Sequence, residues 1–345
     1  MKAGVLLSVN DVSYTTIADP KLEVGDMLLK VKAATVCGTD IRLLRGKKTS
    51  GIRYPSVLGH EFAGVVVNSG GNTQFAMGQA VCVCPQFSCG HCPYCIRGAE
   101  NLCRNTTAMG YEIDGAFAEY VRIPLAGVKS GNVFKVPEGL SFEEAALAEP
   151  LACVMNGQER VGLKMGDTIA ILGAGPIGIL HIKLARLSGA RMIIVSEPNP
   201  LRREAALKAG ADFAIDPSAE NLFARVKSAT GDLGVDVAIV AIGVPSLAND
   251  AIRLVCHRGR VSLFAGFNKG QQAELDVNAI HYNELVITGS FGLTRQSFER
   301  ALNMIASGQL EMKSLVTHRF GLSDIKLALN TAEQGSAIKV AVLND

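Results

Sequence analysis

The sequence predicts an α/β chain of two domains, a doubly wound parallel sheet and a β-rich domain. The chain has 345 residues, and at about 150 residues per domain this length fits two domains. From about Gly166 onward, short apolar runs alternate with helix-like segments, which is typical of βαβ units around a buried parallel sheet. Before about residue 150, short β-type runs punctuated by glycine and proline predict an irregular, partly antiparallel β domain.

The expected elements follow from these runs. In the β-rich part, strands are expected at 3–9, 27–31, 64–67 and 80–83. In the second part, strands are expected at 168–172, 192–196, 237–241, 261–265 and 285–288, with helices at 179–187, 201–209 and 219–228. A helix is expected to join the domains near 149–166, and a helix at 296–306 precedes a final strand at 337–343.

The composition is that of a globular chain with ample material for buried cores. Hydrophobic residues make up 48% and charged residues 19%, which is too little charge for intrinsic disorder. The net charge of +2 is too small to indicate binding to nucleic acid or to an anionic membrane. No run of 18 apolar residues occurs, and the run at 3–9 is followed at once by Asn10 and Asp11. We therefore expect no transmembrane helix, no signal peptide, and neither a membrane nor a nucleic-acid partner.

Six of the nine cysteines lie between Cys82 and Cys103. Tight clustering without a secretion signal predicts metal thiolates in a reducing cytoplasm rather than disulfides. Cys82 and Cys84 alternate on an expected strand, so core packing is predicted for them. The other four offer the donor set of a closed structural zinc site: Cys89, Cys92, Cys95 and Cys103. Gly90 and Gly98 supply the backbone freedom for the wrap. An iron–sulfur cluster and unligated cysteines are the alternatives.

A glycine-rich turn follows the expected strand 168–172 and precedes an expected helix. In this G-x-G-x-x-G pattern the glycines permit a tight turn and close approach to a pyrophosphate, while the helix N-terminus attracts the phosphates. In this context the pattern predicts a Rossmann dinucleotide-binding loop formed by Gly173, Gly175, Pro176, Ile177 and Gly178. A turn that binds nothing is the alternative.

The carboxylate of Glu197, nineteen residues after Gly178, ends the next expected strand. It could accept both ribose hydroxyls of the adenosine half and would repel a 2'-phosphate, so NAD is favoured over NADP. Arg202 and Arg203 keep NADP open, because an arginine there could pair with a phosphate. Arg202 could equally lie flat against the adenine ring.

Three further segments join a metal-capable side chain to a turn or strand end: 37–40, 59–61 and 149–150. A cysteine, a histidine and one or two carboxylates would hold zinc with one position open, and these are Cys37, His60, Glu61 and Glu149. Beside a nicotinamide, such a zinc would polarise an alcohol oxygen, and Thr39 could accept the alcohol proton. Taken singly, Cys37 is as well explained by burial and His60 by an ordinary hydrogen bond.

Together these motifs resemble the zinc-dependent medium-chain dehydrogenase/reductase family, in particular its polyol (sorbitol) and threonine dehydrogenase branch. The likeness covers essentially the whole chain: C-G-T-D at 37–40, G-H-E at 59–61, the cysteine loop at 89–103, D-G-x-F-A-E-Y at 114–120, E-P-L at 149–151 and G-A-G-P-I-G at 173–178. It implies a GroES-like catalytic domain at 1–150 and 290–345, an NAD-binding Rossmann domain at 151–289, and a site in the cleft between them. It also implies two zinc ions and a homo-oligomer, a tetramer by analogy or else a dimer.

The resemblance assigns roles to single residues. Cys37, His60 and Glu61 become catalytic zinc ligands, and Glu149 becomes a fourth ligand or a partner of the zinc-bound water; Cys153 is a minor rival. Nicotinamide contacts are implied for residues that would otherwise be plain strand ends: Ala265, Gly266, Ser290 and Phe291. Lys339 is similar to a basic residue near the pyrophosphate, although an exposed strand lysine is the favoured explanation.

The implied activity is reversible oxidation of a secondary alcohol by NAD, on a polyol or sugar-derived substrate. An L-threonine 3-dehydrogenase is the alternative, with Arg42 or Arg295 as the partner of the substrate carboxylate. A non-catalytic dinucleotide sensor is a further alternative. Arg42 stands where many relatives carry a proton-relay histidine, and it cannot shuttle protons at neutral pH. It could instead hold an anionic substrate group or face solvent.

Overall fold

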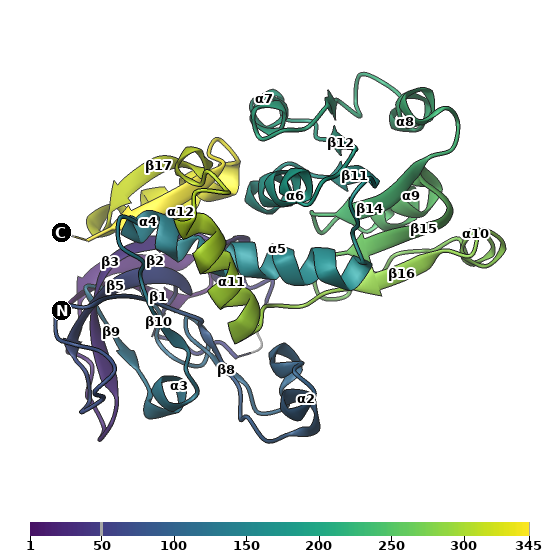
Figure 1. Cartoon of the computed structure of the whole chain (residues 1–345). Coiled ribbons are helices and arrows are strands. Elements are labelled where there is room, and N and C mark those ends of the chain that lie inside the picture. The colour runs from purple at the N-terminus through teal and green to yellow at the C-terminus, as the bar shows by residue number, and fades with distance from the viewer. Residues whose placement is uncertain (49–50, 345) are drawn as a thin grey trace. The chain divides into compact units, whose positions relative to one another are not determined.

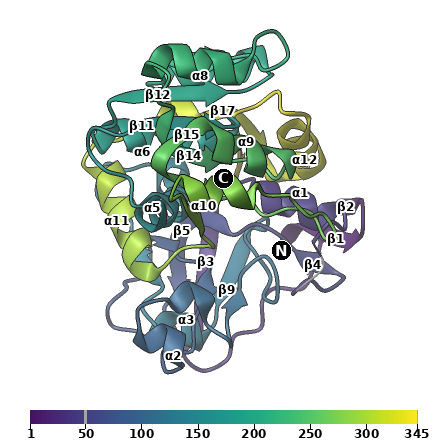
Figure 2. The same cartoon turned by 90° about the vertical axis from the view of Figure 1, so that its right-hand side faces the viewer.

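The computed structural model describes residues 1–48 and 51–344. The chain forms two compact units, a first unit made of Met1–Ala152 with Leu293–Asp345 and a second unit made of Cys153–Gly292. Each unit is built on its own principal β-sheet (Figures 1 and 2).

The second unit contains one six-stranded sheet of order β13-β12-β11-β14-β15-β16. Every neighbouring pair of its strands is parallel. This is the strand order of a Rossmann sheet, and it confirms the doubly wound fold predicted from the sequence. The strands are β11 (Thr168–Leu172), β12 (Met192–Ser196), β13 (Phe213–Ile215), β14 (Val235–Val240), β15 (Val255–Leu263) and β16 (Val286–Gly289).

Helices cover both faces of this sheet because its central strands are mostly apolar and buried. All five residues of β11 are buried, so the strand needs cover on either side. Two helices, α6 and α7, lie on one face, and α8 and α9 lie on the other, with α10 beside α9 (Figure 1). The helices are α6 (Pro176–Leu187), α7 (Pro200–Lys208), α8 (Leu222–Thr230), α9 (Ser246–Leu254) and α10 (Val277–Tyr282).

The first unit contains a seven-stranded sheet of order β10-β6-β5-β3-β18-β17, with β9 added by its pairing with β3. A three-stranded sheet, β2-β1-β4, and a two-stranded sheet, β7-β8, complete it. Of these pairs β17 and β18 are parallel and the others antiparallel, which confirms the predicted β-rich domain. The strands are β1 (Lys2–Ser8), β2 (Asp11–Thr16), β3 (Met27–Thr35), β4 (Ser56–Val57), β5 (Glu61–Asn68), β6 (Ala80–Val83), β7 (Gln86–Phe87), β8 (Thr107–Ala108), β9 (Tyr120–Ile123), β10 (Val133–Lys135), β17 (Val316–Gly321) and β18 (Lys339–Leu343).

The remaining helices lie in the first unit, apart from α5, which begins there and continues along the chain into the second unit. They are α1 (Gly38–Leu44), α2 (Pro93–Ile96), α3 (Leu125–Lys129), α4 (Phe142–Ala146), α5 (Ala148–Val161), α11 (Arg295–Ala306) and α12 (Ile325–Gln334), with single 3₁₀ turns at Glu100–Leu102, Lys313–Leu315 and Leu322–Asp324. Among the described residues, no helix has both the length and the apolar character needed to span a bilayer.

Strand register brings three polar side chains to one end of the seven-stranded sheet. Thr35, the last residue of β3, is paired with Glu61, the first residue of β5. On its other side Thr35 is paired with Ala341, two positions after Lys339 in β18. Paired residues, and residues two apart on one strand, point to the same face of a sheet. Thr35, Glu61 and Lys339 therefore share one face, although they are far apart in the sequence.

Two glycines of the turn after β11 should differ in their effect on stability. A methyl group on Gly178 would meet the carbonyl oxygen of Gly173, whereas nothing lies within 4 Å of the corresponding position on Gly175. We expect Gly178→Ala to lower the free energy of unfolding by about 1–3 kcal/mol. Gly175→Ala should change it by at most about 1 kcal/mol. The chain has no tryptophan, so far-UV circular dichroism in urea is the measurement, and equal midpoints would contradict the expectation.

Candidate active site and metal centres

The four cysteines of the 89–103 loop come together at one point of the first unit. Their sulfur atoms all lie within 4.8 Å of one another, so a single metal ion could contact all four. The shortest separations are 3.5 Å between Cys92 and Cys95 and 4.0 Å between Cys89 and Cys95. None of the nine cysteines, all within the described ranges, forms a disulfide. This donor set fits a closed structural zinc site.

Local backbone geometry folds this loop around its sulfur atoms. Gly90 and Gly98 adopt φ values of +76° and +78°, in the left-handed region that favours glycine. A hydrogen bond from the backbone of Cys95 lowers the pKa of Cys92 to about 6. This thiol therefore gives up its proton readily, as metal binding requires.

Arg295, the first residue of α11, ties the cysteine loop to the rest of the first unit. Its guanidinium lies 2.7 Å from the Glu100 carboxylate and also donates to the Ser130 carbonyl. The suggestion that Arg295 holds a substrate carboxylate is therefore not supported, because Glu100 already neutralises its charge.

Cys82 and Cys84 are fully buried at β6 and do not join the cluster. Burial raises the pKa of both thiols, that of Cys84 to about 12. They stay protonated at neutral pH and act as small apolar side chains, which confirms the packing role predicted for them.

A second donor group forms where α1 begins and β5 begins. The ligand atoms of Cys37, His60 and Glu61 all lie within 4.8 Å of one another. The set combines one thiol, one imidazole and one carboxylate, and so leaves a fourth tetrahedral position open. Among the described residues Glu149 and Cys153 are outside this group. Glu149 is buried in the first turn of α5, where its charge acts on Lys339.

Asp40 holds the first two members of this group in place. Its Oδ2 accepts a 2.8 Å hydrogen bond from the backbone N–H of Cys37, which caps α1. Its Oδ1 lies 3.3 Å from Nδ1 of His60, and Asp40 is fully buried. A carboxylate behind one ring nitrogen orients a histidine so that Nε2 faces a metal. The spacing of Asp40 three residues after Cys37, that of a helix cap, was the signal in the sequence.

Glu61 supplies the clearest test of whether a cation fits. The residue is fully buried. Its Oε2 lies 2.5 Å from Nζ of Lys339 and accepts a hydrogen bond from Thr35. Its Oε1 is buried and, among the described residues, has no hydrogen-bond partner. Buried polar atoms are almost always paired, so an orphaned carboxylate oxygen beside a thiol and an imidazole fits a metal ligand.

Lys339 is buried in β18, not exposed on the surface of the strand. It is only 3% exposed, so the expectation of an exposed strand lysine is wrong. Burial lowers the pKa of Lys339, but Glu61, Cys37 and Glu149 together outweigh burial, and the pKa stands above its usual value. Its ammonium neutralises Glu61, a pairing that requires β3, β5 and β18 to be in register.

Tyr111 closes one side of the second donor group, and nothing in the sequence motifs pointed to it. Its ring lies 5.4 Å from that of His60, and its hydroxyl hydrogen-bonds with Thr39. Burial lowers the pKa of His60, but neighbouring acidic groups, Asp40 and Cys37 among them, outweigh burial, and the pKa stands well above its usual value. The surroundings thus stabilise positive charge where a metal ion would bind.

The glycine-rich turn has the geometry of a dinucleotide loop. Gly173 adopts φ +101°, and Gly175 precedes α6, whose first residues are Pro176 and Ile177. Gly178 lies so close to the Gly173 carbonyl that no side chain fits. Proline at the first helical position leaves the following backbone N–H groups pointing out of the helix toward a phosphate.

Glu197, directly after β12, is buried beside this turn. Its two oxygens accept hydrogen bonds from the backbone N–H groups of Ala174 and Asn199, at 2.8 Å and 3.0 Å. A carboxylate has about four acceptor positions, so capacity remains for ribose hydroxyls. Arg203 is bonded to Asp216, at 3.0 Å, and to backbone carbonyls. Arg202 is half-buried, and among the described residues its Nε has no partner.

The residues expected to contact nicotinamide all follow the carboxyl ends of parallel strands. Ala265 and Gly266 come after β15, and Ser290 and Phe291 come after β16. The Ser290 hydroxyl is buried without a hydrogen-bond partner among the described residues, and Phe291 is 60% exposed. They thus share an edge of the sheet with the glycine turn, where ligands of such folds bind.

Ile242 and Val244, which follow β14 at this same edge, were missed from the sequence. Both are about 40% exposed, at 41% and 40%. Exposed apolar side chains at a ligand-binding edge are candidates to pack against a cofactor ring. Their place directly after an expected strand was the available signal.

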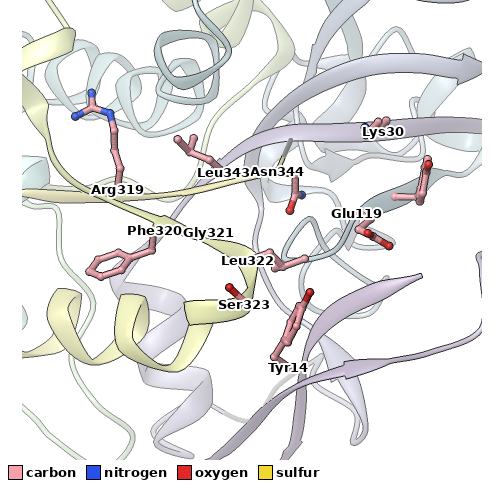
Figure 3. A pocket seen from close by; sticks show the side chains of 11 residues that line it. Tyr14, Lys30, Glu119, Arg319, Phe320, Gly321, Leu322, Ser323, Leu343 and Asn344 are labelled. Atoms are coloured by element: carbon pink, nitrogen blue, oxygen red, sulfur yellow. The ribbon is translucent and has the colours of Figure 1, made fainter.

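One cavity of the first unit contains none of the expected site residues. It measures about 520 Å³ and its lining includes Tyr14, Lys30, Glu119 and Arg319 (Figure 3). Two of its charged groups are already engaged: Glu119 accepts from the backbone of Lys2, and Arg319 pairs with Glu143 at 2.8 Å. Among the described residues, none that line this cavity belongs to either donor group.

Comparison with known proteins agrees with this geometry. Residues 23–138 match the alcohol dehydrogenase GroES-like domain and residues 176–307 match the zinc-binding dehydrogenase family. Sorbitol dehydrogenase of Bacillus subtilis (strain 168) is 33% identical over 99% of this chain and 97% of its own. L-threonine 3-dehydrogenase of Pseudoalteromonas translucida (strain TAC 125) is 35% identical over 100% and 99%. A solved structure from Sinorhizobium meliloti 1021, described as a zinc-binding dehydrogenase bound to NADP, has a TM-score of 0.92 at 35% identity, covering 99% of both chains.

Fold and donor sets define a zinc-binding dehydrogenase that uses a nicotinamide dinucleotide. The chain belongs to the zinc-dependent medium-chain dehydrogenase/reductase family, in its polyol and threonine dehydrogenase branch, as the sequence motifs suggested. It is an alcohol dehydrogenase acting on small-molecule alcohols, and the non-catalytic sensor is set aside.

Removing the Lys339 ammonium should destabilise the first unit strongly. Lys339→Met leaves the buried Glu61 carboxylate without its counter-ion, which costs about 3–5 kcal/mol. Arg319→Met, which breaks a more exposed pair on β17, should cost about 1 kcal/mol or less. Urea unfolding with a chelator present is the measurement, so that no metal replaces the ammonium. Equal losses in the two variants would contradict a buried Lys339–Glu61 pair.

Proposed function

We propose that this protein catalyses the reversible, NAD-dependent oxidation of a secondary alcohol in a polyol or sugar-derived substrate. The observation that carries the proposal is the buried, unpartnered oxygen of Glu61 beside Cys37 and His60. A lone acceptor in such a place is costly unless a cation meets it. A mixed donor set with an open position belongs to catalytic rather than structural zinc sites.

Each unit has its own part in the proposal. Residues 1–150 and 290–345 form the catalytic domain, and residues 151–289 bind NAD. Cys37, His60 and Glu61 would hold the catalytic zinc, Glu149 would supply a further carboxylate for it, and the 89–103 cysteines would hold a structural zinc. When bound, zinc polarises the alcohol oxygen and NAD accepts the hydride. Hydride transfer needs both groups at once, which is why one chain carries both sets of residues.

Thr39 is proposed to take the proton of the alcohol hydroxyl. Its hydrogen bond with Tyr111 gives it a fixed partner. Burial raises the pKa of Tyr111, so this phenol remains neutral and can donate or accept a hydrogen bond without carrying charge. Arg42, in the last turn of α1, keeps its proton at neutral pH. Thr39, rather than Arg42, would therefore pass the proton toward solvent.

On the cofactor side, the backbone of the Gly173–Gly178 turn binds the pyrophosphate. Glu197 accepts the adenosine ribose hydroxyls and selects NAD, with Arg202 against the adenine ring. Ala265, Gly266, Ser290 and Phe291 contact the nicotinamide from the ends of β15 and β16. The bonding of Arg203 to Asp216 supports NAD, because it removes one of two candidate partners for a 2'-phosphate.

L-threonine 3-dehydrogenase is the second candidate. It needs a cation for the substrate carboxylate, and Arg42 is the remaining one of the two that the sequence offered, since Arg295 is paired with Glu100. We further propose that the chain works as a homo-oligomer in a reducing cytoplasm. Nine cysteines without a disulfide are in keeping with such a compartment.

Replacing a zinc ligand should abolish turnover and spare cofactor binding. We expect His60→Ala to lower kcat by about a thousandfold or more, because zinc supplies several kcal/mol of the catalysis. NAD affinity, measured by titration calorimetry, should hardly change. His281→Ala, an exposed histidine of α10, is the matched control. Undiminished turnover in His60→Ala would contradict the role of His60 as a ligand of catalytic zinc.

The choice between NAD and NADP should depend on the charge of Glu197. Glu197→Gln keeps an oxygen for the backbone N–H of Ala174 but removes the negative charge that repels a 2'-phosphate. We expect the ratio of kcat/KM for NAD over NADP to fall by about tenfold or more. Glu220→Gln, an exposed carboxylate of the same unit, serves as control. A ratio that stays the same in Glu197→Gln would refute the selecting role.

A further inference from the structure

Two cations lie at the end of α1, next to the second donor group. Arg42 is in the last turn of the helix, and Lys48 follows shortly after it. The chain between them folds back, because the backbone N–H groups of Lys47 and Lys48 both donate to the Arg42 carbonyl, at 2.8 Å and 3.2 Å. The proposed oxidation of a polyol or sugar-derived alcohol assigns no role to either positive charge.

Lys48 reaches the donor group through Tyr111. Its Nζ lies 4.2 Å from the centroid of the Tyr111 ring, and that ring lies 5.4 Å from the ring of His60. The Tyr111 hydroxyl bonds to Thr39, the proposed proton acceptor. An aromatic face holds an ammonium in place without neutralising its charge. Lys48 is therefore held on the Tyr111 ring, on the side of the proposed substrate position.

The charges around Lys48 leave it short of a counter-ion. Burial lowers the pKa of Lys48 and Arg42 lowers it further. Cys37, Glu112 and Asp40 act in the opposite direction but do not restore the usual value. Within residues 1–48 and 51–344, no carboxylate is within ion-pair distance of its Nζ. Glu112 is instead bonded to the backbone N–H of Ala108 at 2.9 Å.

We infer that Lys48, held on Tyr111 and flanked by Arg42, binds an anionic group, a carboxylate or a phosphate, carried by the alcohol substrate. This inference rests on the proposed function, because it assumes that the alcohol itself lies at Cys37, His60 and Glu61. An anion here would pair with the Lys48 ammonium and offset the repulsion that Arg42 exerts on it. The substrate is thus a sugar acid, a hydroxy acid or a sugar phosphate rather than a neutral polyol.

Kinetics on matched substrates test this inference. Glucitol, gluconate and glucitol 6-phosphate share a polyol chain and differ in their anionic group. We expect Lys48→Met to lower kcat/KM for the preferred anionic substrate by about 10- to 100-fold, the worth of a hydrogen bond to a charged group. The value for glucitol should fall far less, and Lys48→Arg should recover most of the loss. The comparison of gluconate with glucitol 6-phosphate shows whether the anionic group is a carboxylate or a phosphate.

Lys135→Met, at an exposed lysine of β10, is the control. An equal fall for neutral and anionic substrates would overturn the inference.

Direct binding gives a readout that does not depend on turnover. Inorganic phosphate and acetate are titrated by nuclear magnetic resonance into zinc-loaded protein saturated with NAD, so that the glycine turn is occupied. Wild type should bind one of the two anions at least about tenfold more tightly than Lys48→Met at equal zinc content. Identical affinities would refute the inference even if the enzyme oxidises polyols. If no alcohol is oxidised by the wild type, the proposed function fails, and this titration alone decides whether Lys48 binds anions.

Discussion

A single buried carboxylate governs the arrangement of the first unit. Glu61 is fully buried, and burying an ionised carboxylate is costly unless charge and hydrogen bonds compensate. Lys339 and Thr35 compensate one of its oxygens, and the other is left bare. Because these partners lie on β3 and β18, a slip of either strand by one residue would turn its side chain to the opposite face. The pair thus fixes the register of the sheet and, at the same time, points a negative oxygen at Cys37 and His60.

Two other buried carboxylates, Asp40 and Glu197, likewise use their two oxygens to hold two segments of the chain together. Asp40 caps α1 with one oxygen and faces His60 with the other, so one residue positions both a thiol and an imidazole. In the second unit, Glu197 joins the glycine turn to the segment after β12 in the same manner. The zinc group at Cys37 and His60 and the glycine turn therefore each rest on a buried carboxylate that bridges two segments.

Local pattern was enough to predict much of the fold. The expected strands 80–83, 168–172 and 192–196 coincide with β6, β11 and β12, because each is an apolar run bounded by turn residues. β17 escaped prediction, since its sequence carries His318 and Arg319 and its residues alternate between buried and exposed. Such a strand is defined by its neighbour β18 rather than by its own composition.

The candidate site was predictable where residue types and spacing carry the chemistry. The four-cysteine loop and the group of Cys37, His60 and Glu61 could be proposed from their metal-binding side chains, and the structure brings each set together. The environment of Lys339 could not be read, because its partner Glu61 is distant in the sequence and a lone strand lysine is usually exposed. Tyr111 and Lys48 belong to no motif, and only the folded chain places them beside His60.

Zinc stoichiometry is the measurement that most directly tests the proposal of two metal centres in this chain. Purified protein is passed over a weak chelator to remove loosely held metal, and zinc per chain is counted by atomic emission. We expect about two zinc ions per chain, one in the cysteine loop and one at Cys37, His60 and Glu61. A count of about one, lost in Cys103→Ser but kept in Cys37→Ser, would contradict the second centre.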